Sequence, residues 1–526
     1  MLEVDQMKNE KIAFENTGSF SSIFLDYLKN KPELDEFFGL APSLENFEQQ
    51  IKNKRTSHTP RELVSKVLTE QYRDLVLSGK LVKNINLLQR DTTFTITTGH
   101  QLNIFTGPVF FIYKIVTVIN ICRQLKDKYP DFDFVPVYWM ASEDHDFQEI
   151  NHFHLFGKKY SWDLALKGAV GRLPTESLKE ILDQLPERVP VFEESYLTQP
   201  NLAAATRQIV NHLFGDDGMV VIDGDHPKLK SCFTNVMKDD LIHHQAYHKV
   251  IQASEELQNR GYKVQVNPRE INLFYLMPDD RQRLVKKDGE YQVLQSEQVF
   301  SKTELLAIID QHPERLSPNV VLRPIYQETI LPNLAYVGGP GEIAYWLQLK
   351  STFDHYQVHF PILMPRNHAL IINKSQTQKI QKLQIHLDEL FLDTHQLKTL
   401  FMEKHHDQNL ALEQEKEFLA DIYETILKKS KRVDGSLEGF VGAEKSKALK
   451  MLDNIGKRLK KAEEIKQETS ISQLARLREK LFPENKLQER TLNFLNFYLN
   501  NPEFIQDLKE QFDPFDFRFN IITEDG

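Results

Sequence analysis

Charged and polar side chains crowd one short stretch of the chain, SEDHDFQEINH at positions 142–152. Carboxylate and imidazole groups are the usual donors and acceptors of protons in enzymes, so we predict Asp144, His145 and Asp146 as acid–base residues. The neighbours that we expect to bind a substrate are Glu143, Asn151 and His152. A simpler role stays open, because Ser142 or Asp144 could instead cap a following helix.

A second candidate loop, GHQLNIFTGP at positions 99–108, contains two glycines that would let the backbone approach a ligand closely. The helix that begins near Pro108 would offer free N–H groups and a positive dipole end, which favour an anion. The predicted binding residues are Gly99, His100, Gln101, Thr106, Gly107 and Lys114. The alternative is a plain strand-to-helix turn without a ligand.

A third loop, GGPGE at positions 338–342, is again rich in glycine. We predict that Gly338 and Gly339 line a binding site, and that Glu342 binds a cation or favours the helix dipole. Arg366 could hold a carboxylate or phosphate through two parallel hydrogen bonds, although an ordinary structural ion pair is equally open.

The elements around these loops predict one parallel sheet. Residues 94–98 and 134–140 are expected strands, and the apolar residues 110–125 between them are an expected buried helix. In such a βαβ unit the strands are parallel, and ligands bind beyond their carboxyl ends, where the first two loops lie. Further strands are expected at 218–225, 334–337 and 362–365, and one long helix at 227–260.

The fold class that follows is α/β, with a parallel sheet core over residues 1–370. Two connecting subdomains are expected as insertions, at about 155–218 and 261–300. Leucine and isoleucine recur at spacings of three and four over 371–481, which predicts an antiparallel coiled coil and a homodimer formed through it. The aromatic-rich segment 482–526 is expected to pack back on the body.

Composition narrows the function classes. The 526 residues carry a net charge of -10, without the overall basicity of a nucleic-acid binder. No apolar run is long enough for a membrane span, and the N-terminus has no apolar signal core, so we expect a cytoplasmic protein without a membrane partner. The two cysteines, Cys122 and Cys232, exclude a disulfide framework and a zinc site built on paired cysteines.

Four long motifs occur in order: TGHQLNIFTGP, VPVYWMASEDHDFQEINH, LRPIYQETILPNLAYVGGPGEIAYWLQL and FPILMPR. Together they resemble the bacillithiol biosynthesis cysteine-adding enzyme (BshC) family over essentially the whole chain. The pair Gly99–His100 also resembles part of the HxGH loop of nucleotidyl-transferring Rossmann enzymes. Because the BshC family usually has TGQQ where this chain has TGHQ, we assign His100 to binding and not to catalysis.

The resemblance implies a ligase that adds L-cysteine to the amine of glucosaminyl-malate in the last step of bacillithiol synthesis. It also implies a Rossmann-like sheet core with two inserted connecting subdomains and a C-terminal coiled coil that dimerises. ATP is implied as a possible cofactor for activating the cysteine carboxylate, and no metal is predicted. Two other classes of function stay open. One is a dimeric scaffold that binds a metabolite without turning it over, and the other is a metal-dependent hydrolase centred on His145 and His152.

Overall fold

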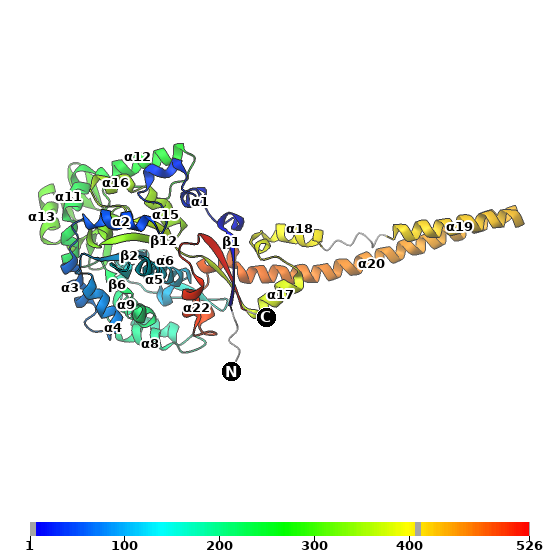
Figure 1. Cartoon of the computed structure of the whole chain (residues 1–526), viewed down its shortest axis with the longest axis horizontal. Helices are drawn as coiled ribbons and strands as arrows, with labels where there is room; N and C mark the ends of the chain where they lie inside the picture. The colour runs from blue at the N-terminus through cyan, green and yellow to red at the C-terminus, as the bar shows by residue number, and fades with distance from the viewer. Residues whose placement is uncertain (1–6, 405–411, 525–526) are drawn as a thin grey trace. The chain divides into compact units, whose positions relative to one another are not determined.

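The computed structural model describes residues 7–404 and 412–524, which form two compact units (Figure 1). One unit comprises Met7–Leu370 and Leu487–Ile522, and the other is built from Ile371–Lys486 with residues 523–524. Among the described helices, none has the length and apolar character needed to cross a membrane.

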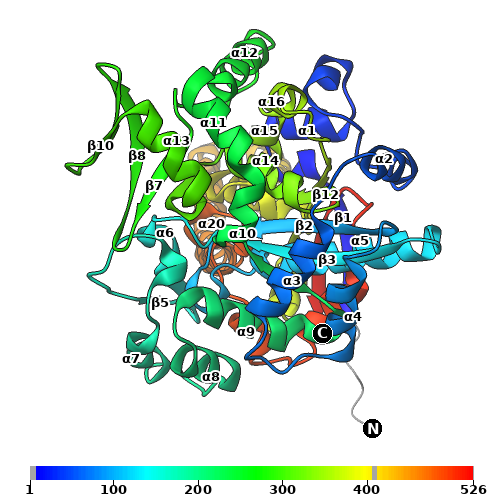
Figure 2. The same cartoon turned by 90° about the vertical axis from the view of Figure 1, so that its left-hand side faces the viewer.

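A five-stranded parallel sheet forms the centre of the larger unit (Figure 2). Its spatial order is β13-β12-β2-β3-β6. The strands are β2 (Thr93–His100), β3 (Asp133–Met140), β6 (Val220–Asp223), β12 (Asn333–Gly338) and β13 (Ile362–Pro365). The chain therefore proceeds outward from β2 in one direction through β3 and β6, and later in the other direction through β12 and β13. This order confirms the predicted Rossmann-like fold class.

Helices cover the sheet because its strands are apolar on both faces, with every residue of β12 and β13 buried. The crossover helix α5 (Phe110–Lys128) packs on β2, β3 and β12, while α15 (Pro340–Leu347) packs on β12 and β13. Five further helices lie around the sheet: α1 (Ser22–Leu28), α2 (Asn46–Arg55), α3 (Arg61–Gln71), α4 (Gly79–Leu87) and α16 (Lys350–His355).

Two long connections interrupt the sheet. Between β3 and β6 lie α6 (Phe147–Ile150), β4 (His152–Leu155), β5 (Lys158–Ser161), α7 (Lys179–Leu182), α8 (Pro190–Thr198) and α9 (Leu202–Phe214). Between β6 and β12 lies an antiparallel sheet of order β10-β9-β8-β7-β11. Its strands are β7 (Leu273–Met277), β8 (Asp280–Lys287), β9 (Glu290–Val293), β10 (Val299–Phe300) and β11 (Leu316–Pro318), flanked by α13 (Lys302–Gln311) and α14 (Leu322–Ile330).

The single helix predicted over 227–260 is wrong. The segment forms α10 (Pro227–Lys230), α11 (Thr234–His243) and α12 (Gln245–Asn259), with His244 in the left-handed region at φ 53° between the last two. Because a left-handed residue reverses the helical path, α11 and α12 cannot be continuous.

The segment that follows residue 486 returns to the larger unit through α21 (Leu495–Tyr498), α22 (Phe504–Gln511) and β15 (Arg518–Glu524). Strand β15 lies between β1 (Met7–Ala13) and β14 (Ala369–Ile372). Glu489 of this segment is fully buried, and its Oε1 lies 2.7 Å from both Arg366 Nη2 and His368 Nδ1. The Ala369 N–H donates to its other oxygen at 3.1 Å.

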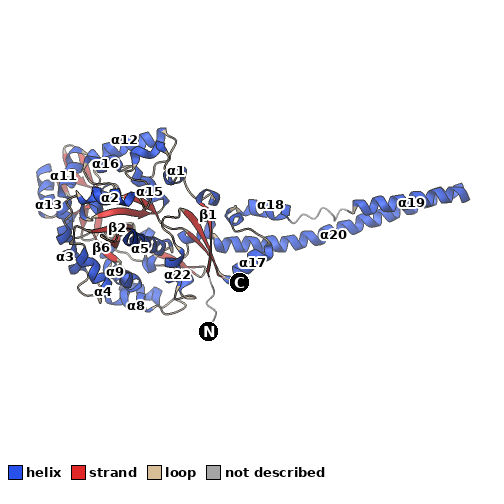
Figure 3. Ribbon diagram, viewed as in Figure 1, coloured by secondary structure: helices blue, strands red, loops and turns tan. Residues whose placement is uncertain are grey.

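The smaller unit is helical (Figure 3). It contains α17 (Lys374–Leu383), α18 (Thr394–Lys404), α19 (Glu413–Val433) and the 44-residue α20 (Glu438–Leu481). Helices α19 and α20 pack side by side and antiparallel, with ion pairs of 2.8 Å from Lys416 to Asp453 and 2.7 Å from Lys445 to Glu424. The predicted coiled coil is confirmed.

The buried Glu489 carboxylate yields a stability prediction. Replacing Glu489 by Gln leaves the Arg366 guanidinium without its ion-pair partner, so we expect a loss of about 3 kcal/mol in unfolding free energy. All three tryptophans lie in the larger unit, so their fluorescence during urea unfolding reports its stability. The exposed Glu503 provides the matched control, and Glu503→Gln should unfold like the parent protein. Equal unfolding free energies for the two variants would contradict the stabilising role of the buried Glu489–Arg366 ion pair.

Candidate functional site

A cavity of about 490 Å³ opens at the carboxyl ends of β2 and β12. This is the point where the strand order reverses, since β3 follows β2 on one side and β12 pairs with β2 on the other. Crevices at such switch points are the usual ligand sites of parallel α/β sheets. Its lining includes Gly99 from the end of β2, Gly339 at the N-cap of α15 and Gly341 in the first turn of α15.

Lys114 joins the first and third loops at the floor of this cavity. It projects from the first turn of α5, and its ammonium donates to the Gly99 carbonyl at 2.8 Å and lies 2.5 Å from Glu342 Oε2. Burial lowers the pKa of Lys114. Burial alone would raise the pKa of Glu342, but the charge of Lys114 with hydrogen bonds from the Tyr336 hydroxyl and Gly339 N–H holds it below its ordinary value. The cavity floor therefore carries an ionised Glu342.

Arginines supply positive charge to the same cavity. Arg366 is buried and paired with Glu489, yet its Nε has no hydrogen-bond partner among the residues that the structure describes. Arg323 donates to Gln327 at 3.1 Å and to the Tyr345 hydroxyl at 3.4 Å, both uncharged partners. Arg490 also lines the cavity. An anionic group would satisfy the free Nε and the charge of Arg323, so the cavity fits an anion.

Part of the predicted anion site at the start of helix α5 is occupied by other residues of the chain. The Val109 N–H, which precedes the helix, donates to the Leu492 carbonyl at 2.8 Å, and Asn493 Nδ2 donates to the Gly107 carbonyl at 2.6 Å. The segment after residue 486 therefore occupies this end of the helix. Gly107 serves the turn itself, because it has φ 62° and a Cβ there would lie 2.6 Å from Asn103 Cβ.

His100 lines the cavity as a neutral ring. It lies against Phe110 and Phe111, with ring centroids 5.1 and 5.4 Å away. Burial, reinforced by the charge of Lys114, lowers the pKa of His100 to about 3. A neutral imidazole gives little electrostatic attraction to a phosphate or carboxylate, so the anion-binding charge comes from the arginines.

A second cavity, of about 430 Å³, adjoins the first and shares Trp139, Ala141 and Arg323 with it. Glu143, Asp144 and His145 line this second cavity. Gln101 of the first cavity connects the two, because its amide nitrogen donates to Asp144 Oδ2 at 2.8 Å and to Glu149 Oε2 at 2.5 Å. The acidic loop and the GGPGE loop therefore lie at adjoining cavities along one edge of the sheet.

Arg281, from strand β8 of the antiparallel sheet, determines the protonation state of the His145 ring. Its Nη1 lies 2.9 Å from His145 Nδ1 and 3.7 Å from Asp144 Oδ1. An arginine can only donate, so Nδ1 accepts and the neutral ring carries its proton on Nε2. Burial and the charge of Arg281 lower the pKa of His145. His145 is therefore neutral and has no lone pair free toward a substrate.

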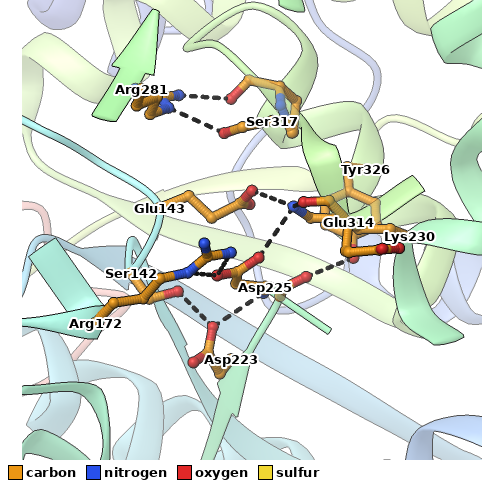
Figure 4. Close-up of polar contacts among 12 residues, drawn as sticks. Ser142, Glu143, Arg172, Asp223, Asp225, Lys230, Arg281, Glu314, Ser317 and Tyr326 are labelled. Carbon is orange, nitrogen blue, oxygen red and sulfur yellow. Dashed lines mark hydrogen bonds and ion pairs between the residues drawn. The ribbon is translucent and has the colours of Figure 1, made fainter. Parts of the chain in front are cut away.

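Glu143 belongs to a buried ion cluster at the wall of the second cavity (Figure 4). Lys230 is fully buried and lies 2.5 Å from Glu143 and 3.1 Å from Asp225. Arg172 pairs with the same Asp225 at 2.7 Å, and the Ser142 hydroxyl hydrogen-bonds Asp223. Burial raises the pKa of Glu143 against the pull of Lys230. This cluster ties the loop after β3 to the end of β6 and fixes its position.

The structure divides the predicted residues into three groups. Seven line the first cavity, namely Gly99, His100, Gln101, Lys114, Gly339, Glu342 and Arg366. Three line the second, namely Glu143, Asp144 and His145. Six line neither: Thr106, Gly107, Asp146, Asn151, His152 and Gly338. Asp146 accepts from the Glu149 N–H and caps α6, and Asn151 donates to the Trp162 carbonyl at 3.2 Å.

Several lining residues lay outside the predicted set, namely Trp139, Arg269, Arg281, Arg283, Arg323, Tyr336, Tyr345 and Arg490. Four of them lie within the sequence motifs that carry the family resemblance, namely Trp139, Arg323, Tyr336 and Tyr345. Arg281 and Arg283 lie in a strand of ordinary alternating pattern, where a surface position and a cavity position look alike.

The family of the chain follows from comparison with known proteins. A model described as "Bacillithiol biosynthesis BshC, N-terminal Rossmann-like domain" matches residues 7–367, and one for the "C-terminal coiled-coil domain" of BshC matches residues 369–524. The chain belongs to the BshC family. The resemblance carried by the four motifs is thereby confirmed.

Relatives within the BshC family align over almost their full length. Proteins named "Putative cysteine ligase BshC" from Flavobacterium psychrophilum and Christiangramia forsetii are 43% and 42% identical to the chain, over 98% of the chain and 99% of their own length. The protein of that name from Cytophaga hutchinsonii is 40% identical over 97% of the chain and 98% of its own length.

A metal centre on the acidic loop receives no geometric support. Within residues 7–404 and 412–524, no three histidine, cysteine, aspartate or glutamate side chains are grouped to hold a metal ion. Moreover, the Arg281 guanidinium occupies His145 Nδ1, where its positive charge opposes a cation.

The neutral state of His100 generates a pH prediction. Because its folded pKa of about 3 lies below the ordinary value of 6.5, the unfolded chain binds the proton first and stability falls as the pH drops below 6.5. We expect this residue to account for a loss of about 1–2 kcal/mol in unfolding free energy between pH 7 and pH 5. His100→Gln should lose correspondingly less over that interval in urea unfolding. The exposed His212→Gln serves as the control, and an unchanged pH slope in His100→Gln would contradict the burial argument.

Proposed function

We propose that this protein is a cysteine ligase, which joins the carboxyl group of L-cysteine to the amine of glucosaminyl-malate in the last step of bacillithiol synthesis. The observation that carries the proposal is the pair of adjoining cavities with a common wall at the switch point of the sheet. The names of the relatives support the ligase class. A reaction between two substrates needs two sites that bring the reacting atoms together, which this arrangement provides.

In the proposed reaction, the sugar amine attacks the activated carboxyl carbon of cysteine. A C–N bond forms, the C–O bond to the leaving group breaks, and the nitrogen releases a proton. Asp144 is the best-placed acceptor, because its carboxylate lines the second cavity next to the shared wall. Its Oδ2 accepts from Gln101 and its Oδ1 from the His145 N–H at 2.8 Å, which fix its orientation. His145 does not suit this role, since its Nδ1 lone pair already faces Arg281.

ATP is the co-substrate that we propose for activation. The donor set of the first cavity fits an anionic phosphate chain, with the unpartnered Nε of Arg366 and the side chains of Arg323 and Arg490 as the groups that would hold it. ATP would supply the leaving group that an unactivated carboxylate lacks. The chain's own residues bind both substrates, orient them and accept the proton.

Reconstitution tests the proposal directly. Purified protein is incubated with L-cysteine, glucosaminyl-malate and ATP, and with each component left out in turn, and the thiol product is measured by mass spectrometry. We expect the cysteinyl conjugate only in the complete mixture. Product formed equally well without ATP would reject the activation step, and no product in the complete mixture would reject the ligase. A scaffold protein that binds the substrates without turnover would also give no product in the complete mixture.

Two neighbouring carboxylates offer a matched test of the proton acceptor. Asp144→Asn keeps the hydrogen-bonding shape but removes the base, so we expect kcat to fall about 100-fold or more. Asp146→Asn changes the same group two residues away, at a helix cap outside both cavities, and should retain nearly the parent kcat. Steady-state rates at saturating substrates compare the two. Equal losses in both variants, or none in Asp144→Asn, would remove Asp144 from the mechanism.

We also propose that the helical unit dimerises. Apolar side chains along α19 and α20 stay exposed in the hairpin, with Ile422 56%, Ile455 46% and Leu459 40% exposed. An apolar seam of this kind is stable when a partner helix covers it. A second copy of the chain provides such a partner.

The dimer prediction is tested by mass in solution. The parent chain should elute at twice its mass of 61.5 kDa in size exclusion with light scattering. Ile455→Glu combined with Leu459→Glu should give the single-chain mass, because each introduced charge would be buried in the interface. Asn454→Glu adds a charge at an exposed polar position of the same helix and should stay dimeric. A parent protein of single-chain mass would contradict the proposal.

A further inference from the structure

Four arginines surround the second cavity, although the sequence motifs pointed to acidic residues there. The loop after β3 forms one wall, and the antiparallel sheet of the second insertion forms the other. The arginines are Arg269, Arg281, Arg283 and Arg323. All four come from the connection between β6 and β12, with Arg281 and Arg283 in strand β8 and Arg323 in α14, so the folding of this connection brings them to one cavity.

Arg281 is held rigidly at this cavity. It is 6% exposed, its Nε donates to the Ser317 hydroxyl at 3.1 Å, and its Nη2 donates to the Pro318 carbonyl at 3.3 Å. Its guanidinium carbon lies 3.9 Å from the centre of the Phe274 ring. A guanidinium fixed in this way loses little conformational entropy when it binds an anion.

The remaining arginines leave the cavity with uncompensated positive charge. In the described part of the chain, Arg269, Arg283 and Arg323 make no ion pair with a carboxylate. The acidic side chains nearby are already engaged, since Glu143 pairs with Lys230 and Asp144 faces Arg281. The cavity therefore attracts an anion with more than one negative group.

We propose that this arginine cavity binds the dicarboxylate part of the sugar substrate, an inference that rests on the proposed ligase function and assigns its second substrate to a place. Planar guanidinium groups match carboxylates through paired hydrogen bonds. The first cavity, with its glycine turns and the free Nε of Arg366, is left for the activated cysteine. With the malate portion held by the arginines, the sugar amine lies toward the shared wall, beside Asp144.

Calorimetric titration of the full chain tests the assignment. The probes are glucosaminyl-malate, L-malate and glucosamine, which lacks the dicarboxylate. We expect the parent protein to bind glucosaminyl-malate more tightly than glucosamine, and L-malate to compete. Arg269→Gln and Arg283→Gln should each raise the Kd for glucosaminyl-malate by about 10-fold or more, and leave the Kd for glucosamine unchanged. Lys287→Gln removes a charge from the exposed end of the same strand and should bind like the parent.

Each other outcome overturns the assignment. Unchanged Kd values in both arginine variants would mean that the dicarboxylate binds elsewhere. Displacement by ADP but not by L-malate would assign the cavity to the nucleotide. Failure of the proposed ligase reaction can be told apart from failure of the dicarboxylate site. Binding that depends on the arginines, without any thiol product, would support the site and reject the reaction. Turnover that is unaffected by both arginine variants would support the reaction and reject the site. Thermal unfolding of each variant confirms that it is folded.

Discussion

The reversal of strand order at β2 is the constraint on which the site depends. Strand β2 pairs in parallel with β3 on one side in continuous register, and with β12 on the other side with a register shift between Asn333 and Ala335. Because the chain leaves β2 in one direction and returns on the other side more than 230 residues later, no connection covers the carboxyl ends of β2 and β12. Loops from distant parts of the sequence meet there, and the two cavities are the space between them.

Charge pairing explains which of the many ionic groups are available to a ligand. Burying an ion is costly unless a partner of opposite charge lies beside it, and the larger unit meets this requirement around its cavities. Lys114 pairs with Glu342, Arg366 with Glu489, and Lys230 with Glu143 and Asp225. These pairs hold three loops and the segment after residue 486 in fixed positions. Among the cavity residues, Arg269, Arg283 and Arg323 make no ion pair with a carboxylate of the described part of the chain, so they are the groups from which ligand binding gains most.

Local patterns in the sequence were enough to predict the parallel sheet, but not the contacts that distant segments of the chain make around it. The apolar runs at 94–98 and 134–140 and the glycine turn at 338–341 predicted strands, loops and fold class, because each depends on neighbours in the chain. The contact at the start of α5 could not be predicted, because the Leu492 carbonyl that accepts the Val109 N–H lies almost four hundred residues away in the chain. Periodicity carries no information about such contacts. The same limit hid Arg281, whose position at His145 depends on how the second insertion folds back.

In the proposed reaction, the junction between the cavities must satisfy two opposing demands on the amine of the substrate. Carboxylates attract the ammonium form, and Asp144 and Glu149 lie together there, both accepting from the amide of Gln101. Only the neutral amine has a lone pair for attack, and the positive charges of Arg281 and Arg323 disfavour the ammonium form. The carboxylates would thus attract an amine to the shared wall, and the arginines would favour the loss of its proton. Gln101, which is neutral and donates to both carboxylates, holds them in place without cancelling either charge. A lysine at that position would neutralise one of the carboxylates and remove the balance that a proton acceptor requires.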